Sequence, residues 1–297
     1  MERRRKMKKV LKKIVSGVLA VSAFIACGAT FTACETDKPE VAITLGFNGK
    51  SYTLSYQMNR KVTPKTVQHF IALADKGYYN ETADKKICIH DYEASRWYTG
   101  GYAYTGEESE PLRELDYFST VKSYIPQSVW ADSKKATPTY TLYGEFSKNN
   151  YVVENGELKE SFGSLVMYYE TKTVDAEVYI ERNQDAGKNA ALAPRSYEYN
   201  SATSMFYISL GTSSKKNSNY CVFATLDSDS VNTLKNLQTA INDYIEDTYG
   251  EETSDFTQSE IVTIETNPAV VGDKTSSKSY DVPKQPIYLK SVKVTKY

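Results

Sequence analysis

The side chains that most often carry chemistry in proteins are few in this 297-residue chain. It has two histidines, His69 and His90, and four cysteines, of which Cys88 and Cys221 lie in the body of the chain. Neither type has the short spacing of a metal site, so we expect no metal and no other cofactor. A hydrolase is also disfavoured, because there is no Gly-x-Ser-x-Gly elbow and His90 has no identifiable triad partners.

Tyrosine is unusually abundant, with 25 residues. It combines an apolar ring with a polar tip, which suits half-buried strands and peptide-contacting surfaces, and the surface of a sheet is the simpler explanation. In residues 199–211, Met205, Tyr207 and Ser209 alternate with Phe206 and its apolar neighbours at positions 208 and 210. This period of two predicts a strand with one apolar face, and residues 219–226 predict its antiparallel neighbour.

Other elements follow along the chain. Residues 41–56 predict a hairpin around Asn48-Gly49. A helix is expected from an N-cap at Thr63 to Gly77, and a second helix after Asp227. Residues 102–140 and 171–199 are interpreted as loop-like excursions, the first as a surface insertion, and residues 251–284 as a loop that contains one strand at 261–265. The expected fold class is mainly β.

The N-terminus is a targeting segment. Eight basic residues between positions 3 and 13 precede an apolar stretch, as in a secretory signal. The stretch ends in Phe-Thr-Ala-Cys34, which resembles the lipobox of bacterial lipoproteins and implies cleavage before Cys34 and diacylglycerol on its sulfur. Cys27 is a weaker competing site, and a spanning anchor is the alternative. We therefore expect a signal peptide and lipobox over 1–34, a tether over 35–40, one domain over 41–297, and an extracytoplasmic location on the bacterial cell membrane.

Cleavage changes the charge of the chain. Without residues 1–33 it loses eight basic residues and Glu2, which leaves 28 basic and 36 acidic residues and a net charge of about −8. Nucleic acid is therefore not expected as a partner, because its phosphates require positive charge. Two buried thiols are the expected state of Cys88 and Cys221, with a disulfide as the alternative outside the cell.

A set of collinear motifs resembles the cyclophilin-type peptidyl-prolyl isomerases. Each motif is short, and their order over residues 40–297 carries the resemblance: PKTVQHF at 64–70, GYY at 77–79, GG at 100–101, GEFS at 144–147, GSLVM at 163–167, SMFYI at 204–208, VF at 222–223 and PIYLKSV at 286–292. The resemblance implies a closed antiparallel β-barrel capped by two α-helices, here with long loop insertions.

The resemblance also implies a reaction. Peptide bonds before proline isomerise slowly, over a barrier of about 18 to 20 kcal/mol, because rotation breaks amide resonance. The family lowers it with an arginine that donates a hydrogen bond to the prolyl nitrogen in the twisted state. Alignment from Gly77 places Lys86 at the arginine position, and alignment from Gly101 places Asp91 there. Arg96 is the only arginine nearby, so Lys86 and Arg96 are the candidate catalytic residues.

The peptide groove is expected to be altered. Tyr207 replaces a phenylalanine that lies under the proline, Thr99 a glutamine and Tyr220 a histidine, so bulk is added and the donor is missing. Phe206 and its neighbour at 208 are expected to fill the barrel. The residues expected to line the groove are His90, Trp97, Thr99, Tyr168, Tyr169, Met205, Tyr207 and Tyr220.

Three functions follow from these patterns. The first is a membrane-anchored, extracytoplasmic cyclophilin-like isomerase and foldase for secreted proteins, with activity that is weak or lost. The second is a non-catalytic cyclophilin-like module on the cell surface that binds proline-containing peptides or proteins. The third is an unrelated surface lipoprotein.

Overall fold

A computed structural model describes residues 36–153, 156, 158–169, 176–181, 192–212, 220–250, 253–265, 267–271 and 275–297. Residues 36–297 form one compact unit. Within the described residues, no helix is both long and apolar enough to cross a membrane. Cys34 and the signal segment before it lie outside the described residues, so their assignment stays a prediction.

The first hairpin has the predicted geometry. Strands β1 (Glu40–Phe47) and β2 (Lys50–Met58) pair in antiparallel register from Glu40↔Gln57 to Phe47↔Lys50. Asn48 and Gly49 form the turn, with φ of 44° and 76°. Positive φ at both central positions is what a two-residue hairpin turn requires, and Asn-Gly tolerates it best. The predicted hairpin at 41–56 is confirmed.

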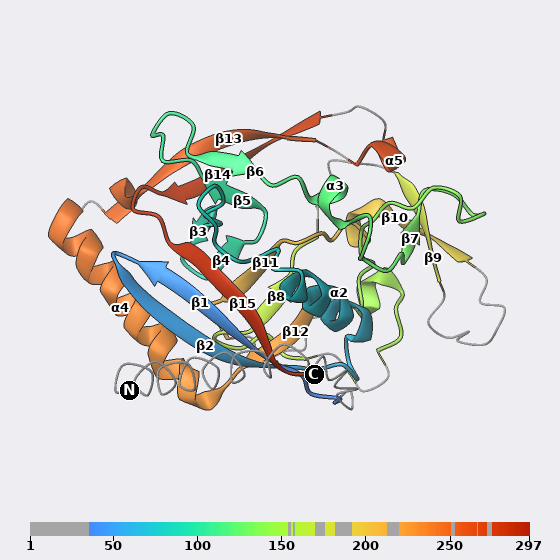
Figure 1. Ribbon diagram of the computed structural model, residues 1–297, viewed down its shortest axis with the longest axis horizontal. Helices are drawn as coiled ribbons and strands as arrows, with labels where there is room; N and C mark the ends of the chain where they lie inside the picture. The colour runs from blue at the N-terminus through green and yellow to red at the C-terminus, as the bar shows by residue number, and fades with distance from the viewer. Residues whose placement is uncertain are drawn as a thin grey trace, which may run out of the picture. The chain divides into compact units, whose positions relative to one another are not determined.

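One curled antiparallel sheet organises the fold (Figure 1). Its eight strands run in the order β15-β1-β2-β12-β8-β11-β4-β3. The remaining members are β15 (Tyr288–Lys296), β12 (Cys221–Leu226), β8 (Leu165–Met167), β11 (Phe206–Ser209), β4 (Arg96–Thr99) and β3 (Asp91–Glu93). The mainly β fold class is therefore confirmed, and the strand predicted around Tyr207 is β11.

The sheet is not a fully closed barrel, which corrects the expected closure. Its edge strands β3 and β15 do not pair with each other. The short segment before β3 links them instead: Ile89 N donates to Ile287 O and Leu289 N donates to Ile87 O, both at 2.8 Å. Because β3 has only three residues and pairs with β4, a bridge rather than a full ladder joins the two edges.

Two long helices pack on the sheet, as predicted. Helix α2 (Pro64–Asp75) begins after Thr63 and is followed by Gly77 at φ 67°, and it contacts β12 and β15. Helix α4 (Ser228–Tyr249) lies along β2. The fully buried rings of Phe70, Phe206 and Phe223 meet at centroid distances of 5.0 to 5.4 Å and join helix α2 to the sheet.

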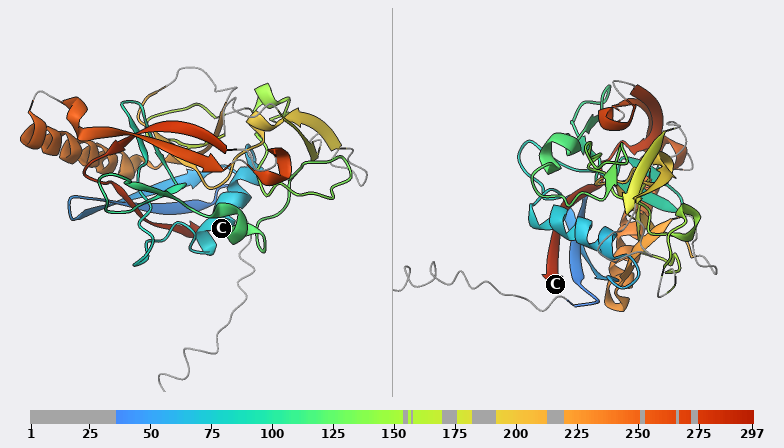
Figure 2. Two further views of the ribbon diagram at one scale, coloured as in Figure 1. Left: turned by 90° about the horizontal axis from the view of Figure 1, so that it is seen from above. Right: turned by 90° about the vertical axis from the view of Figure 1, so that its right-hand side faces the viewer.

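Three segments that were expected as loops, 102–140, 171–199 and 251–284, contain more regular structure than their sequences indicate. Residues 102–140 hold β5 (Tyr102–Tyr104), β6 (Leu112–Glu114), α3 (Tyr117–Val121) and β7 (Val129–Trp130). Residues 171–199 supply β9 (Glu177–Glu181), β10 (Leu192–Ser196) and the 3₁₀ turn η2 (Tyr197–Tyr199), and β7, β9 and β10 form a separate sheet at the end of the molecule opposite α4 (Figure 2). Tertiary pairing between distant segments stabilises these short strands, and local patterns do not reveal it.

The region 251–284 contains two long strands where one was expected. Strands β13 (Thr257–Glu265) and β14 (Thr275–Pro283) form a hairpin with nine paired positions, preceded by η3 (Thr253–Phe256), with α5 (Pro268–Val271) between the strands. The prediction missed β14 because its Ser-rich sequence, TSSKSYDVP, is typical of a loop. Strand β14 packs beside β3, and this contact brings the hairpin to the site described next.

Candidate functional site

A row of side chains crosses the outer face of four neighbouring strands. Tyr98 on β4 pairs with Tyr207 on β11, Tyr207 with Val166 on β8, and Val166 with Val222 on β12. Val166, Tyr207 and Val222 are buried and form one apolar cluster with Tyr98 at its edge. Alternation along β11 turns Phe206 and Ile208 inward and Tyr207 outward, as the period of two predicts.

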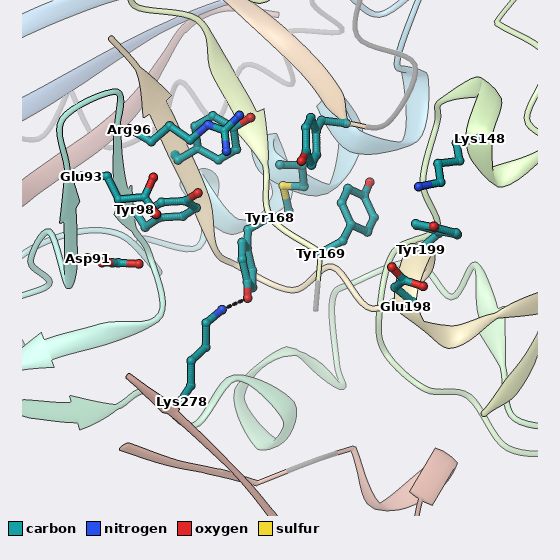
Figure 3. Close-up of a pocket in the computed structure, with 13 residues that line it drawn as sticks. Asp91, Glu93, Arg96, Tyr98, Lys148, Tyr168, Tyr169, Glu198, Tyr199 and Lys278 are labelled. Atoms are coloured by element: carbon teal, nitrogen blue, oxygen red, sulfur yellow. Dashed lines mark hydrogen bonds between the residues drawn. The ribbon is translucent and has the colours of Figure 1, made fainter. Parts of the chain in front are cut away.

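A pocket of about 280 Å³ opens over this row. Strands β3, β4, β8, β11 and β14, the turn η2 and the 3₁₀ turn η1 (Ser147–Asn149) contribute to it. In Figure 3, Tyr168 and Tyr169 lie between an end formed by Asp91, Glu93, Arg96 and Tyr98 and an end formed by Lys148, Glu198 and Tyr199. The lining residues are Asp91, Glu93, Arg96, Tyr98, Lys148, Met167, Tyr168, Tyr169, Glu198, Tyr199, Tyr207, Tyr220 and Lys278.

Arg96 covers the aromatic floor of the pocket. Its guanidinium carbon lies 5.0 Å from the ring centroid of Tyr207 and 5.4 Å from that of Tyr220, both within the range of a cation–π contact. Its Nε is 3.7 Å from Oε1 of the buried Glu160. Arg96 is therefore a cationic donor beside the floor of the pocket, held on three sides by its neighbours.

Lys278 closes the pocket from the side of the β13–β14 hairpin. Its ammonium lies 4.3 Å from the ring centroid of Tyr168 and donates a hydrogen bond to the hydroxyl of that residue (Figure 3). Three residues further along β14, the backbone N–H of Asp281 donates to Oδ1 of Asp91 at 3.1 Å. These two contacts make a late segment of the chain part of the pocket wall.

Asp91 is a carboxyl group in an unfavourable place for a charge. Burial raises its pKa to about 6, and the nearby carboxyls of Glu93 and Asp281 act in the same direction. The hydrogen bond from Asp281 and the charge of Lys278 oppose this rise. One alignment places Asp91 where the family has its arginine, so the pocket holds a titrating acid at the position expected for a donor.

The structure brings together half of the residues expected at the site. Arg96, Tyr168, Tyr169, Tyr207 and Tyr220 all line the pocket. Tyr168 and Tyr169 follow directly after β8 and lie between the two ends of the pocket (Figure 3).

Lys86 and Met205 lie outside the lining of this pocket. Lys86 is exposed, and its ammonium lies 5.9 Å from the ring of Tyr288. Met205 packs against Gly101 and belongs to the apolar cluster beneath the β13–β14 hairpin.

His90, Trp97 and Thr99 are buried and also lie outside the pocket lining. His90 packs between the rings of Tyr102 and Tyr280, where burial lowers its pKa to about 3 and the charge of Lys278 adds to that effect. Thr99 donates to Cys88 O at 2.8 Å. Trp97 and Thr99 have the same parity along β4 and face the core, whereas Arg96 and Tyr98 face outward.

Sequence reasoning missed several lining residues. Tyr98 had a usable signal, because it alternates with Trp97 along the strand that carries Arg96. Lys148 directly follows the motif at 144–147 and Tyr199 begins the stretch at 199–211, so their nearness to the motifs was a usable signal. Glu198 and Lys278 had none, since they lie outside the motifs.

A buried carboxyl group, that of Glu145, holds the start of helix α2. Glu145 Oε2 accepts from Thr66 N at 2.8 Å and from Thr66 Oγ1 at 2.7 Å, and Oε1 accepts from Lys65 N at 3.0 Å. It thus caps helix α2, whereas Thr63, the expected cap, makes no side-chain cap hydrogen bond. Burial raises the pKa of Glu145, and these hydrogen bonds act against the rise.

The two cysteines of the domain are separate buried thiols. Cys88 and Cys221 form no disulfide. Cys221 Sγ lies 3.2 Å from Thr66 Oγ1, and burial raises the pKa of both thiols. The expectation of two buried thiols is confirmed.

Comparison with known proteins identifies the family. Residues 43–265 match the family described as cyclophilin type peptidyl-prolyl cis-trans isomerase/CLD. The chain therefore belongs to the cyclophilin-type peptidyl-prolyl cis-trans isomerases, and any catalytic activity of this domain is prolyl isomerisation. No curated protein sequence matches the chain.

Several solved cyclophilin structures are similar to this chain at low identity. A Cryptosporidium parvum cyclophilin-type isomerase shares 16% identity, over 88% of this chain and 99% of that chain, with a TM-score of 0.41. A structure of it in the presence of the dipeptide Ala-Pro shares 17% identity over 87% and 99%, with a TM-score of 0.39. The Mimivirus cyclophilin shares 14% identity over 69% and 80%, with a TM-score of 0.38.

Proposed function

We propose that this chain is an extracytoplasmic cyclophilin, held at the bacterial cell membrane by lipid on Cys34, that binds proline-containing segments of secreted proteins and isomerises them slowly. The observation that carries this proposal is the position of Arg96, whose guanidinium lies 5.0 Å from the ring of Tyr207. Tyr207 aligns with the phenylalanine under the proline in the family, so Arg96 is beside the place where a prolyl bond would lie.

Arg96 supplies the donor that the reaction requires. A twisted prolyl bond exposes the nitrogen lone pair, and a guanidinium remains charged and donating at physiological pH. A donor that binds only the twisted state lowers the barrier without stabilising the ground state.

The same contacts explain why the proposed rate is low. Arg96 lies over Tyr207 and Tyr220 and is paired with Glu160. A proline ring takes the place over Tyr207 only after the guanidinium has moved away. Part of the binding free energy is therefore used to break these contacts.

The proposed activity is tested with a protease-coupled isomerisation assay on the full-length chain in detergent micelles. Arg96→Ala should reduce the catalysed rate at least tenfold. Arg113→Ala, which removes an exposed arginine outside the pocket, should leave the rate unchanged. An Arg96→Ala rate equal to wild type would exclude Arg96 as the donor.

A second candidate function is a non-catalytic peptide-binding module. Asp91 favours it, because a carboxyl group lines the pocket where one alignment requires an arginine, and an ionised carboxylate cannot donate. A wild-type rate equal to that of buffer, together with measurable binding of proline peptides, would select this alternative.

The proposed location is tested separately. Cys34→Ser removes the sulfur that would carry the lipid, so the protein should move from the membrane fraction to the soluble fraction. Persistence in the membrane fraction would favour a spanning anchor instead.

A further inference from the structure

The hydroxyl group of Tyr207 is a buried polar group in the floor of the pocket. The residue is 2% exposed, and its hydroxyl has no hydrogen-bond partner among the described residues. The ring is held by Val166 and Val222 and by Tyr98, whose ring centroid is 5.1 Å away. The packing fixes the position of the hydroxyl, and leaving it unpaired destabilises the free protein.

Two partly exposed side chains, Arg96 and Tyr220, lie in the pocket lining beside Tyr207. The Arg96 side chain lies over the Tyr207 ring and is 29% exposed. Tyr220 is 37% exposed. By contrast, strand β11, which carries Tyr207, is held on both sides by its ladders to β4 and β8. A ligand that moves Arg96 aside therefore meets the ring and hydroxyl of Tyr207 in a fixed place.

The electrostatics of the pocket indicate which group would bind there. Burial raises the pKa of Tyr207, so the phenol stays protonated and can donate. The pocket lining carries three cationic side chains, Arg96, Lys148 and Lys278, and three carboxyl side chains, Asp91, Glu93 and Glu198. Because these charges balance, the complementary partner of the hydroxyl is a neutral acceptor, and in a peptide that is a main-chain carbonyl oxygen.

We propose that the Tyr207 hydroxyl donates a hydrogen bond to a main-chain carbonyl oxygen of the bound peptide. This proposal rests on the proposed function, and it adds a specificity contact that a phenylalanine at this position cannot make. The contact recognises an extended peptide main chain, because only an extended segment presents free carbonyl groups to a pocket floor. Binding would pair a hydroxyl that has no partner within the part of the chain that the structure describes.

Tyr207→Phe tests the proposal, because it removes the hydroxyl and keeps the ring. Affinities are measured by titration calorimetry on the full-length chain in detergent micelles, with the peptide amides Ala-Ala-Pro-Phe and Ala-Ala-Ala-Phe as probes. The variant should bind the proline peptide about three- to tenfold more weakly. Its melting temperature should stay the same or rise, since removal of an unpaired buried hydroxyl is neutral or stabilising.

Tyr56→Phe is the matched control. Tyr56 is 1% exposed and its hydroxyl also has no partner among the described residues, but it lies in the core and does not line the pocket. The control should change stability in the same direction as Tyr207→Phe and leave peptide affinity unchanged. If the Tyr207 hydroxyl affected only stability, Tyr207→Phe and Tyr56→Phe would bind the peptide with the same affinity.

The outcomes separate this proposal from the proposed function. If wild type binds the proline peptide and Tyr207→Phe binds it equally well, the hydroxyl contact is excluded while the proposed function stands. If both peptides bind equally and Tyr207→Phe weakens both, the contact stands and the preference for proline fails. If wild type binds neither peptide, both proposals are overturned.

Discussion

Asp91→Asn should make the protein more stable at neutral pH and should change how stability depends on pH. The asparagine side chain has the same shape and keeps an oxygen that accepts from the Asp281 N–H, which is 3.1 Å from Oδ1 in wild type. The variant therefore removes the charge and leaves the packing and the hydrogen bond in place.

The sign follows from the raised pKa of Asp91, which moves from 3.8 to about 6. Below about pH 4 the carboxyl group is protonated in the folded and unfolded states, so its ionisation does not affect stability. Between about pH 4 and pH 6 the folded state keeps a proton that the unfolded state has lost. Wild-type stability therefore falls relative to Asp91→Asn across this window, and the difference is complete above pH 6.

The size of the effect follows from the same difference in pKa. A rise from 3.8 to about 6 corresponds to about 3 kcal/mol as an upper bound. Because Asp91 is half-buried, solvent screening reduces the difference to about 1 kcal/mol. For a protein of this size, that is about 3 °C in melting temperature.

The assay is thermal unfolding at half-unit steps from pH 4 to pH 8 in constant ionic strength. Asp84→Asn changes an exposed carboxyl group in a turn outside the pocket, and it should follow the wild-type curve. If the difference between wild type and Asp91→Asn were constant over the whole range, the placement of Asp91 in a desolvated position near the carboxyl groups of Glu93 and Asp281 would be refuted.

Three further predictions concern the cap of helix α2, the two thiols and the β13–β14 hairpin. Glu145→Ala leaves buried donors at the start of helix α2 unpaired, so the free energy of unfolding should fall by about 3 kcal/mol; a change below 0.5 kcal/mol would contradict the proposed cap. Cys88 and Cys221 should each take up one alkylating label in denaturant without reductant and none in the folded protein, as mass spectrometry can check; a denatured chain that needs reductant first would contain a disulfide. Lys278→Ala removes the contacts with Tyr168 and should speed hydrogen exchange in β14 while lowering stability by about 1 kcal/mol or less; unchanged exchange would show that Lys278 does not hold the hairpin.

Local patterns in the sequence were sufficient for much of the fold. Asn48-Gly49 predicted the first hairpin because few other pairs accept positive φ at both positions. The apolar repeat between Thr63 and Gly77 predicted helix α2, and alternation around Tyr207 predicted which side chains leave the core. These signals act between residues that are close in sequence, so the sequence alone displays them.

The remaining elements depend on distant pairing. Strand β14 has the composition of a loop, yet its nine-residue ladder with β13 makes it a strand. Strands β9 and β10 likewise pair with each other and with β7. Such ladders are stabilised by partners that are not visible in a local window.

The residues of the candidate site fall into the same two groups: those that local patterns indicate and those that distant contacts bring in. The sequence placed Tyr168, Tyr169, Tyr207 and Tyr220 together, because collinear motifs put them on or next to three neighbouring strands, and all four line the pocket. It also showed that the arginine expected in the family motif is replaced.

Only the tertiary structure decided which charged side chains meet these rings. Strand alternation and sheet curvature put Arg96 over Tyr207 and leave Lys86 outside the pocket, while the β13–β14 hairpin brings Lys278 to Tyr168 from 110 positions away in the chain. A sequence motif specifies which residue types are available. Which of them meet depends on register and long-range packing, and here these place the guanidinium of Arg96 over the ring of Tyr207.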